Sequence, residues 1–164
     1  MNTERLFMDM MEYYSGDPKQ IQHFMKVHSF AMRIGRAEHL EEKTLCILET
    51  TALVHDIGIK EAIKKHGSSK GKNQEIEGPA IAKEMLEKLR YPQDIIDRVC
   101  YLVGHHHTYN KIDGLDYQIL IEADFLVNMY EENMSNDAIL ATRRKIFKTS
   151  AGIRLCNRMY QLED

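Results

Sequence analysis

Apolar residues recur at helical spacing along most of the chain, and glycine and proline fall mostly between the periodic stretches. The first stretch runs from about Thr3 to Tyr14, and Asp17-Pro18 then provides an N-cap and a first helical residue for the next. Further helices are predicted over residues 41–55, 59–66, about 78–89 and about 92–106, through Leu120–Val127, and from about Asn136 onward. Strand signals are weak, so we expect an all-α bundle of about seven to nine helices.

No repeat or low-complexity linker divides the 164 residues, which are of ordinary single-domain size. We therefore expect one domain over residues 1–164. Its core would span about residues 20–130, with the N-terminal helix and the C-terminal helices packing on it. The basic segment 67–73 is expected to be flexible, and Gly78-Pro79 is expected near the start of the following helix.

Composition narrows the class of protein. Apolar residues make up 43% of the chain and charged residues 29%, which is typical of a globular protein. The net charge of −3 argues against binding to duplex DNA or to an anionic membrane. The N-terminus lacks a signal-peptide pattern, and no apolar run has the length of a membrane span. Three widely spaced cysteines, without a C-x-x-C pair, favour free thiols in a reducing cytoplasm: Cys46, Cys100 and Cys156.

Ionisable residues interrupt the apolar faces of four predicted helices. These residues are His28, His55, His106 and Asp124. Each has a simpler explanation: an inward histidine can be a hydrogen-bonded core residue, Asp124 can be half of a salt bridge, and His55-Asp56 can end a helix. Those explanations are independent of one another, whereas one bound cation would compensate all the buried charges together. The pattern therefore favours a metal site.

The run Leu53-Val54-His55-Asp56-Ile57-Gly58 resembles the signature of the HD-domain superfamily of metal-dependent phosphohydrolases. The resemblance covers about residues 20–130 and extends to the order of an upstream histidine, the His-Asp pair and a downstream aspartate. It implies a helical bundle in which His28, His55, Asp56 and Asp124 bind one divalent metal ion.

The resemblance also implies a second metal ion in some relatives, held by further histidines. Glu77 stands where such relatives usually have histidine, and it is a candidate ligand because a carboxylate can also bind iron, manganese or magnesium. Gly104-His105-His106-His107 resembles their later histidines. Helical facing favours His106, with His105 or His107 as its companion. The donor set suits one or two ions of iron, manganese, cobalt or magnesium, with zinc or nickel as alternatives.

We accordingly expect hydrolysis of a nucleotide or another small phosphoester or phosphoanhydride by a metal-activated water. Asp56 would hold the nucleophile and His106 would orient it or protonate the leaving oxygen. Lys60, Arg33 and Lys111 are the candidate phosphate-binding residues. The alternatives are a non-catalytic nucleotide- or metal-sensing module and a di-iron oxygenase of the same fold. The methionines of the first helix, Met8, Met10 and Met11, suggest either burial in the monomer or a homodimer surface.

Overall fold

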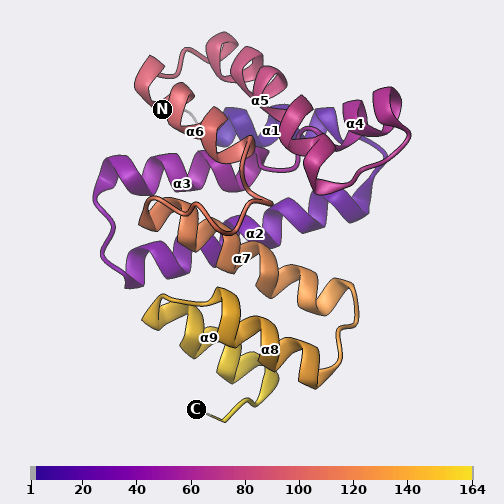
Figure 1. Cartoon of the computed structure of the whole chain (residues 1–164). Coiled ribbons are helices and arrows are strands. Elements are labelled where there is room, and N and C mark those ends of the chain that lie inside the picture. The colour runs from indigo at the N-terminus through magenta and orange to yellow at the C-terminus, as the bar shows by residue number, and fades with distance from the viewer. Residues whose placement is uncertain (1–2, 164) are drawn as a thin grey trace.

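A computed structural model describes residues 3–163, and these form nine α-helices and no strand (Figure 1). Residues 1, 2 and 164 of the expected domain lie outside the described part of the chain. The helices are α1 (Thr3–Tyr13), α2 (Pro18–Ala37), α3 (Glu42–Val54), α4 (Ile59–His66), α5 (Gly71–Lys88), α6 (Gln93–Val103), α7 (Leu115–Glu131), α8 (Asn136–Ile146) and α9 (Ser150–Tyr160). The all-α prediction is confirmed.

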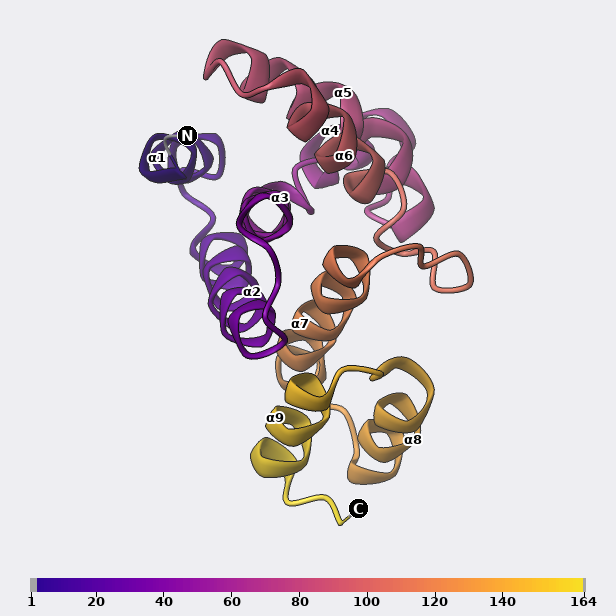
Figure 2. The ribbon, with the colours of Figure 1, turned by 90° about the vertical axis from the view of Figure 1, so that its left-hand side faces the viewer.

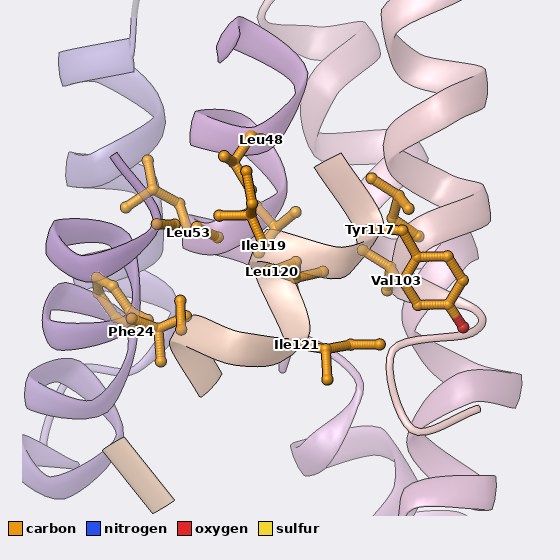
Figure 3. Packing of buried hydrophobic residues seen from close by; sticks show 14 of the residues in the cluster. Phe24, Leu48, Leu53, Val103, Tyr117, Ile119, Leu120 and Ile121 are labelled. Atoms are coloured by element: carbon orange, nitrogen blue, oxygen red, sulfur yellow. The ribbon is translucent and has the colours of Figure 1, made fainter. Parts of the chain in front are cut away.

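Helix α7 lies at the centre of the fold. Of its 17 residues, 12 are buried, because it packs against α2 and α3 as well as α8 and α9. Figure 2 shows α7 between the α2–α3 pair and the C-terminal helices, with α4, α5 and α6 grouped beyond α3. In Figure 3 its residues Ile119, Leu120 and Ile121 lie among core side chains from the other helices, such as Phe24 and Val103. A polar side chain on α7 is consequently enclosed by protein on most sides.

The largest difference from the predicted helices concerns α5. It begins at Gly71, inside the segment expected to be flexible, and it contains Pro79 in its interior. A Cβ atom on Gly78 would lie 2.7 Å from Val103 Cγ1, and one on Gly104 would lie 3.1 Å from the Pro79 ring. These close contacts with α6 and the turn after it stabilise the helix across a proline that would locally disfavour it.

The C-terminal helices are fixed to α7 by a buried carboxylate. Glu122 is fully buried and accepts hydrogen bonds from the Gln118 amide, 2.7 Å, and from the backbone N–H groups of Lys148 and Thr149, 2.6 and 2.9 Å. The Thr149 hydroxyl donates to the same carboxylate and in turn accepts from the N–H of Gly152 at the start of α9. This network satisfies a buried charge and sets where α9 begins.

Other expectations concern the surface of the molecule. None of the helices in residues 3–163 combines the length and apolar character needed to cross a membrane. Cys46, Cys100 and Cys156 form no disulfide. Met10 is buried in the core, whereas Met8 is 58% exposed. Burial in the monomer accounts for Met10, and a homodimer stays a prediction.

Candidate metal centre

The His55-Asp56 pair lies in the tight turn that joins α3 to α4. Backbone hydrogen bonds close this turn from Ile57 N–H to the Val54 carbonyl and from Ile59 N–H to the Asp56 carbonyl, both 3.0 Å. Gly58 has to be glycine because a Cβ atom there would lie 2.7 Å from a backbone oxygen of α5. The turn therefore holds two adjacent polar side chains against the core in fixed directions.

Helix α1 holds the same turn from outside. The Tyr14 hydroxyl donates to the Asp56 carbonyl, 2.7 Å, and the Tyr13 hydroxyl donates to the Ile57 carbonyl, 3.0 Å. The side chain of Asp56 has its own restraint, since the Gln20 amide donates to Oδ2 at 2.8 Å. Both the backbone and the carboxylate of Asp56 are thus fixed.

Four side chains from three parts of the fold converge beside this turn: His23 of α2, His55, Asp56, and Asp124 of α7. His23 Nε2 lies 3.3 Å from His55 Nε2, 3.4 Å from Asp56 Oδ2 and 3.2 Å from Asp124 Oδ1. His55 Nε2 lies 3.6 Å from each of the same two carboxylate oxygens. All four residues are at most 9% exposed.

Hydrogen bonds to the outer ring nitrogens decide which nitrogen of each histidine faces the cluster. His55 Nδ1 lies 3.0 Å from the Ala52 carbonyl, and His23 Nδ1 lies 2.9 Å from Glu131 Oε2. Since a carbonyl and a carboxylate only accept, each Nδ1 is the donor. A neutral ring then carries no hydrogen on Nε2, so two bare nitrogens face each other at 3.3 Å. That arrangement requires a proton or a metal cation between them.

The spacing fits a metal ion. A cation with bonds of about 2.0–2.2 Å has neighbouring ligand atoms roughly 3.0–3.5 Å apart. The separations between the two histidine nitrogens, and from each of them to the two carboxylate oxygens, are 3.2–3.6 Å. Asp124 Oδ1 is buried and forms no hydrogen bond despite lying 3.2 Å from a histidine nitrogen. A buried carboxylate oxygen without a hydrogen bond is costly unless a cation compensates it. The residues present therefore fit a divalent metal ion.

Electrostatics in the cluster show where a proton resides when no metal is bound. Burial works to raise the pKa values of Asp56 and Asp124, but the neighbouring histidines hold both carboxyls well below their usual range. Burial works to lower the pKa of His23, yet Asp124, Asp56 and Glu131 raise it to about 9. At neutral pH the metal-free cluster thus holds two carboxylates and a proton on His23.

A second group of potential ligands shares Asp56. His106 Nε2 lies 3.4 Å from Asp56 Oδ1, and donor atoms of Asp56, His106 and His107 all lie within 4.8 Å of one another. His106 Nδ1 donates to the Val103 carbonyl at 2.8 Å, which directs Nε2 into the site. The buried Nε2 atoms of His106 and His107 have no hydrogen-bond partner among the described residues. Burial, together with neighbouring His106, lowers the pKa of His107 to about 4, so His107 is neutral and able to ligate.

The upstream histidine of the cluster is His23, and the prediction of His28 needs correction. His28 is only half-buried and lies 3.4 Å from Glu49 of α3. Five residues correspond to about 140° around a helix, so His23 and His28 face different neighbours. Because α2 packs against both α3 and α7, it has two apolar stripes, and the predicted register followed the one that faces α3.

Two of the residues predicted for a second metal also lie elsewhere. Glu77 pairs with Lys65 at 2.7 Å and with His66 at 2.8 Å on the outer surface of α4 and α5. His105 Nδ1 lies 2.7 Å from the Tyr101 carbonyl, and its ring stacks on that tyrosine with centroids 4.3 Å apart. Helix α6 ends at Val103, so the histidine run follows the geometry of a turn instead of a helix. His106 and His107 are the histidines that it brings beside Asp56.

The cluster opens into a cleft of about 500 Å³ between the start of α2, the end of α7 and the beginning of α5. It is lined by Asp17, Lys19, Gln20, His23, Asp56, Ile59, Ser69, Gly71, Gln74, His107, Asp124, Asn128, Glu131 and Glu132. Lys19 is the one lysine or arginine in this lining. Of the three predicted phosphate-binding residues, Lys60 contacts the Tyr13 carbonyl and the rings of Tyr13 and Tyr14, and Arg33 and Lys111 are exposed elsewhere.

Several residues at the site had no clear signal in the sequence. Gln74 is buried, donates from its amide nitrogen to the Ser69 carbonyl at 2.7 Å, and leaves Oε1 without a hydrogen-bond partner. The predicted helix began near Gly78, whereas α5 begins seven residues earlier, at Gly71. Gln74 therefore belongs to the helix, and it lines the cleft. Glu131 lies 108 residues after the histidine that it contacts, a separation at which no local pattern reveals a contact.

Comparison with protein families assigns the chain to a family. The model of the HD domain matches residues 21–143, three quarters of the chain. The chain belongs to the HD-domain family. No curated protein and no solved structure matches it. The matched segment runs from α2 into α8, and so includes every HD-domain side chain placed in the cluster above.

Proposed function

We propose that this HD-domain protein is a metal-dependent phosphohydrolase acting on a small phosphoester or phosphoanhydride, with nucleotides as the leading class. The observation that carries the proposal is the convergence of bare histidine nitrogens on buried carboxylates at one end of an open cleft. A cation held there would face bulk solvent and substrate on one side only. Such one-sided access is typical of catalytic metal sites, whereas structural sites are closed.

His23, His55 and Asp56 place their ligand atoms within 4.8 Å of one another and would hold the first ion, with Asp124, 3.2 Å from His23, as the fourth ligand. Asp56, His106 and His107 are the candidates for a second. A bound divalent cation lowers the pKa of water and offsets charge on a phosphoryl group. The carboxylate of Asp56 lies between the two groups, with Oδ2 toward His23 and Oδ1 toward His106.

The chain's own residues restrain this carboxylate and supply a proton site. Gln20 holds Asp56 Oδ2, which limits rotation of the carboxylate. His106 donates through Nδ1 to a carbonyl, so only its Nε2 can act in the site. Burial works to lower the pKa of His106, but Asp56 raises it, and Nε2 can therefore carry a proton. That proton would be available to a leaving oxygen, whereas a second ion held by Asp56, His106 and His107 would take the same Nε2 as a ligand.

The cleft favours a compact substrate that carries few negative charges. Asp17 and Glu132 are acidic groups in its lining, in addition to Glu131, whose charge the ion pair with Lys26 offsets. Lys19 is the one lysine or arginine of the lining. Neutral hydrogen-bonding groups from Gln20, Asn128 and Gln74 complete the polar surface. A nucleoside monophosphate or another small monoester meets less repulsion there than a triphosphate does.

Phosphate release from a panel of nucleotides and phosphoesters tests the proposal. The panel is run with Mn²⁺, Mg²⁺, Co²⁺ or Zn²⁺ and repeated with Asp56→Asn. We expect turnover that depends on added metal and disappears in the variant. Metal binding without turnover on any substrate would contradict hydrolysis and favour the sensing module. Oxygen consumption with iron would favour the oxygenase.

A further inference from the structure

The outer nitrogen of His23 is held by a carboxylate that belongs to neither group of potential metal ligands. Glu131, the last residue of α7, accepts from His23 Nδ1 through Oε2 at 2.9 Å. Its other oxygen, Oε1, lies 2.6 Å from Lys26 Nζ, one turn further along α2. The Glu131 side chain is 14% exposed and that of Lys26 is 39% exposed, so the pair lies between His23 and the surface of the molecule.

His23 differs in this respect from the other histidines of the cluster. His55 and His106 each direct Nδ1 to a backbone carbonyl of their own segment, so their orientation follows from local geometry. His23 lies within a helix, whose backbone carbonyls are engaged in helical hydrogen bonds, and it needs an acceptor from another element. Glu131 provides that acceptor across the α2–α7 interface.

We propose that Glu131, supported by Lys26, is a positioning residue that keeps the proton of His23 on Nδ1 and leaves Nε2 free to bind the metal ion. The inference rests on the proposed metal site. An imidazole without such an acceptor divides its proton between the two nitrogens and rotates more freely. A carboxylate that accepts a hydrogen bond from Nδ1 keeps the proton on that nitrogen and fixes the orientation of the ring. It also makes the ring a stronger ligand.

Lys26 limits the negative charge that Glu131 contributes. The cluster already contains the carboxylates of Asp56 and Asp124, and a third unpaired carboxylate would add to their repulsion. The ion pair with Lys26 lets Glu131 accept the hydrogen bond while adding little net charge. Glu131 therefore acts through the direction of one hydrogen bond, and loss of general negative charge near the cleft is a separate effect.

The test is the Mn²⁺ affinity of the full chain, measured by calorimetry for the wild type, Glu131→Ala and Glu132→Ala. Alanine removes the acceptor, whereas glutamine would keep an amide oxygen able to accept from Nδ1. Glu132 is the matched control because it adjoins Glu131, lines the same cleft and loses the same charge. We expect Glu131→Ala to weaken binding by about 10- to 100-fold, as removal of such outer partners does in other metal sites. Glu132→Ala should stay within about 2-fold. Equal affinities in the two variants would overturn the inference, whereas absence of binding by the wild type would contradict the metal site itself.

A spectroscopic readout covers the case in which Glu131→Ala does not fold. In the wild-type protein loaded with Zn²⁺, ¹H–¹⁵N NMR correlations of the imidazole rings identify the protonated nitrogen, and the His23 signals are those missing from His23→Gln. We expect the proton on Nδ1, with slow exchange, and metal on Nε2. A proton on Nε2, or coordination through Nδ1, would refute the role of Glu131.

Discussion

Removing the metal ion should make the stability of this protein depend steeply on pH above neutrality. Without metal, the pKa of His23 stands at about 9, because burial is outweighed by Asp124, Asp56 and Glu131. In the unfolded chain the same ring has an ordinary pKa of about 6.5. Folding therefore binds a proton at pH values between these two.

The sign and size follow from that difference. A histidine with a raised pKa contributes its full stabilisation below about pH 6.5 and loses it as the pH rises through about 9. At about 1.4 kcal/mol for each pKa unit, the contribution is roughly 3 kcal/mol, most of it lost between those two values. Burial lowers the pKa of His106, but Asp56 outweighs burial and the pKa is raised overall. His106 therefore changes stability in the same direction as His23. A bound metal ion replaces the His23 proton, so the metal-loaded protein should show a much smaller dependence.

Urea denaturation at pH 6.5 and pH 9 measures the effect in chelator-treated protein. We expect the free energy of unfolding to fall by roughly 2 to 3 kcal/mol in the wild type and by clearly less in His23→Gln. His28→Gln is the control, since His28 lies on the same helix beside Glu49 and should leave the dependence unchanged. Equal pH dependence in the His23→Gln variant and the wild type would refute the protonated His23.

Three further changes test other parts of the structure. Gly71→Ala places a Cβ atom 2.5 Å from the His107 ring, so the free energy of unfolding should fall by about 1–3 kcal/mol. If two metal ions bind the wild type, a stoichiometric titration of the variant should show one. Glu122→Gln weakens the buried network that fixes α9; thermal denaturation should show a loss of roughly 3 kcal/mol, and an unchanged midpoint would contradict the network. Lys19→Met should raise KM several-fold in phosphate-release kinetics, whereas Lys60→Met, outside the cleft, should leave KM unchanged.

The sequence supports the fold and the His-Asp turn because both depend on local patterns. A helix with one buried face shows apolar residues at helical spacing, whereas a helix buried on most sides shows a nearly continuous apolar run. The central helix α7, with 12 of its 17 residues buried, is of the second kind, and Leu120, Asp124 and Val127 follow one of its faces. The turn at His55-Asp56 lies at the end of an apolar helix and before a glycine, which again are neighbouring residues. The match of the HD-domain model confirms the resemblance drawn from them.

The predictions of His28 and Glu77 as ligands are wrong for two reasons. One helix packs on two sides, and the other begins earlier than predicted. Helix α2 contacts both α3 and α7, so facing alone does not choose between His28 and His23. Helix α5 begins before Gly78-Pro79, which turns Gln74 toward the cleft and Glu77 toward Lys65. In both cases the deciding contacts come from other elements of the fold.

Metal content is the most direct test of the central claim, that His23, His55, Asp56 and Asp124 form a metal centre. Elemental analysis would compare wild type, His23→Gln and His28→Gln after purification, and again after equilibration with Mn²⁺ and gel filtration. We predict at least one bound ion in the wild type and in His28→Gln, and loss of that ion in His23→Gln. Absence of metal from the reconstituted wild type, or loss in His28→Gln with retention in His23→Gln, would contradict the account.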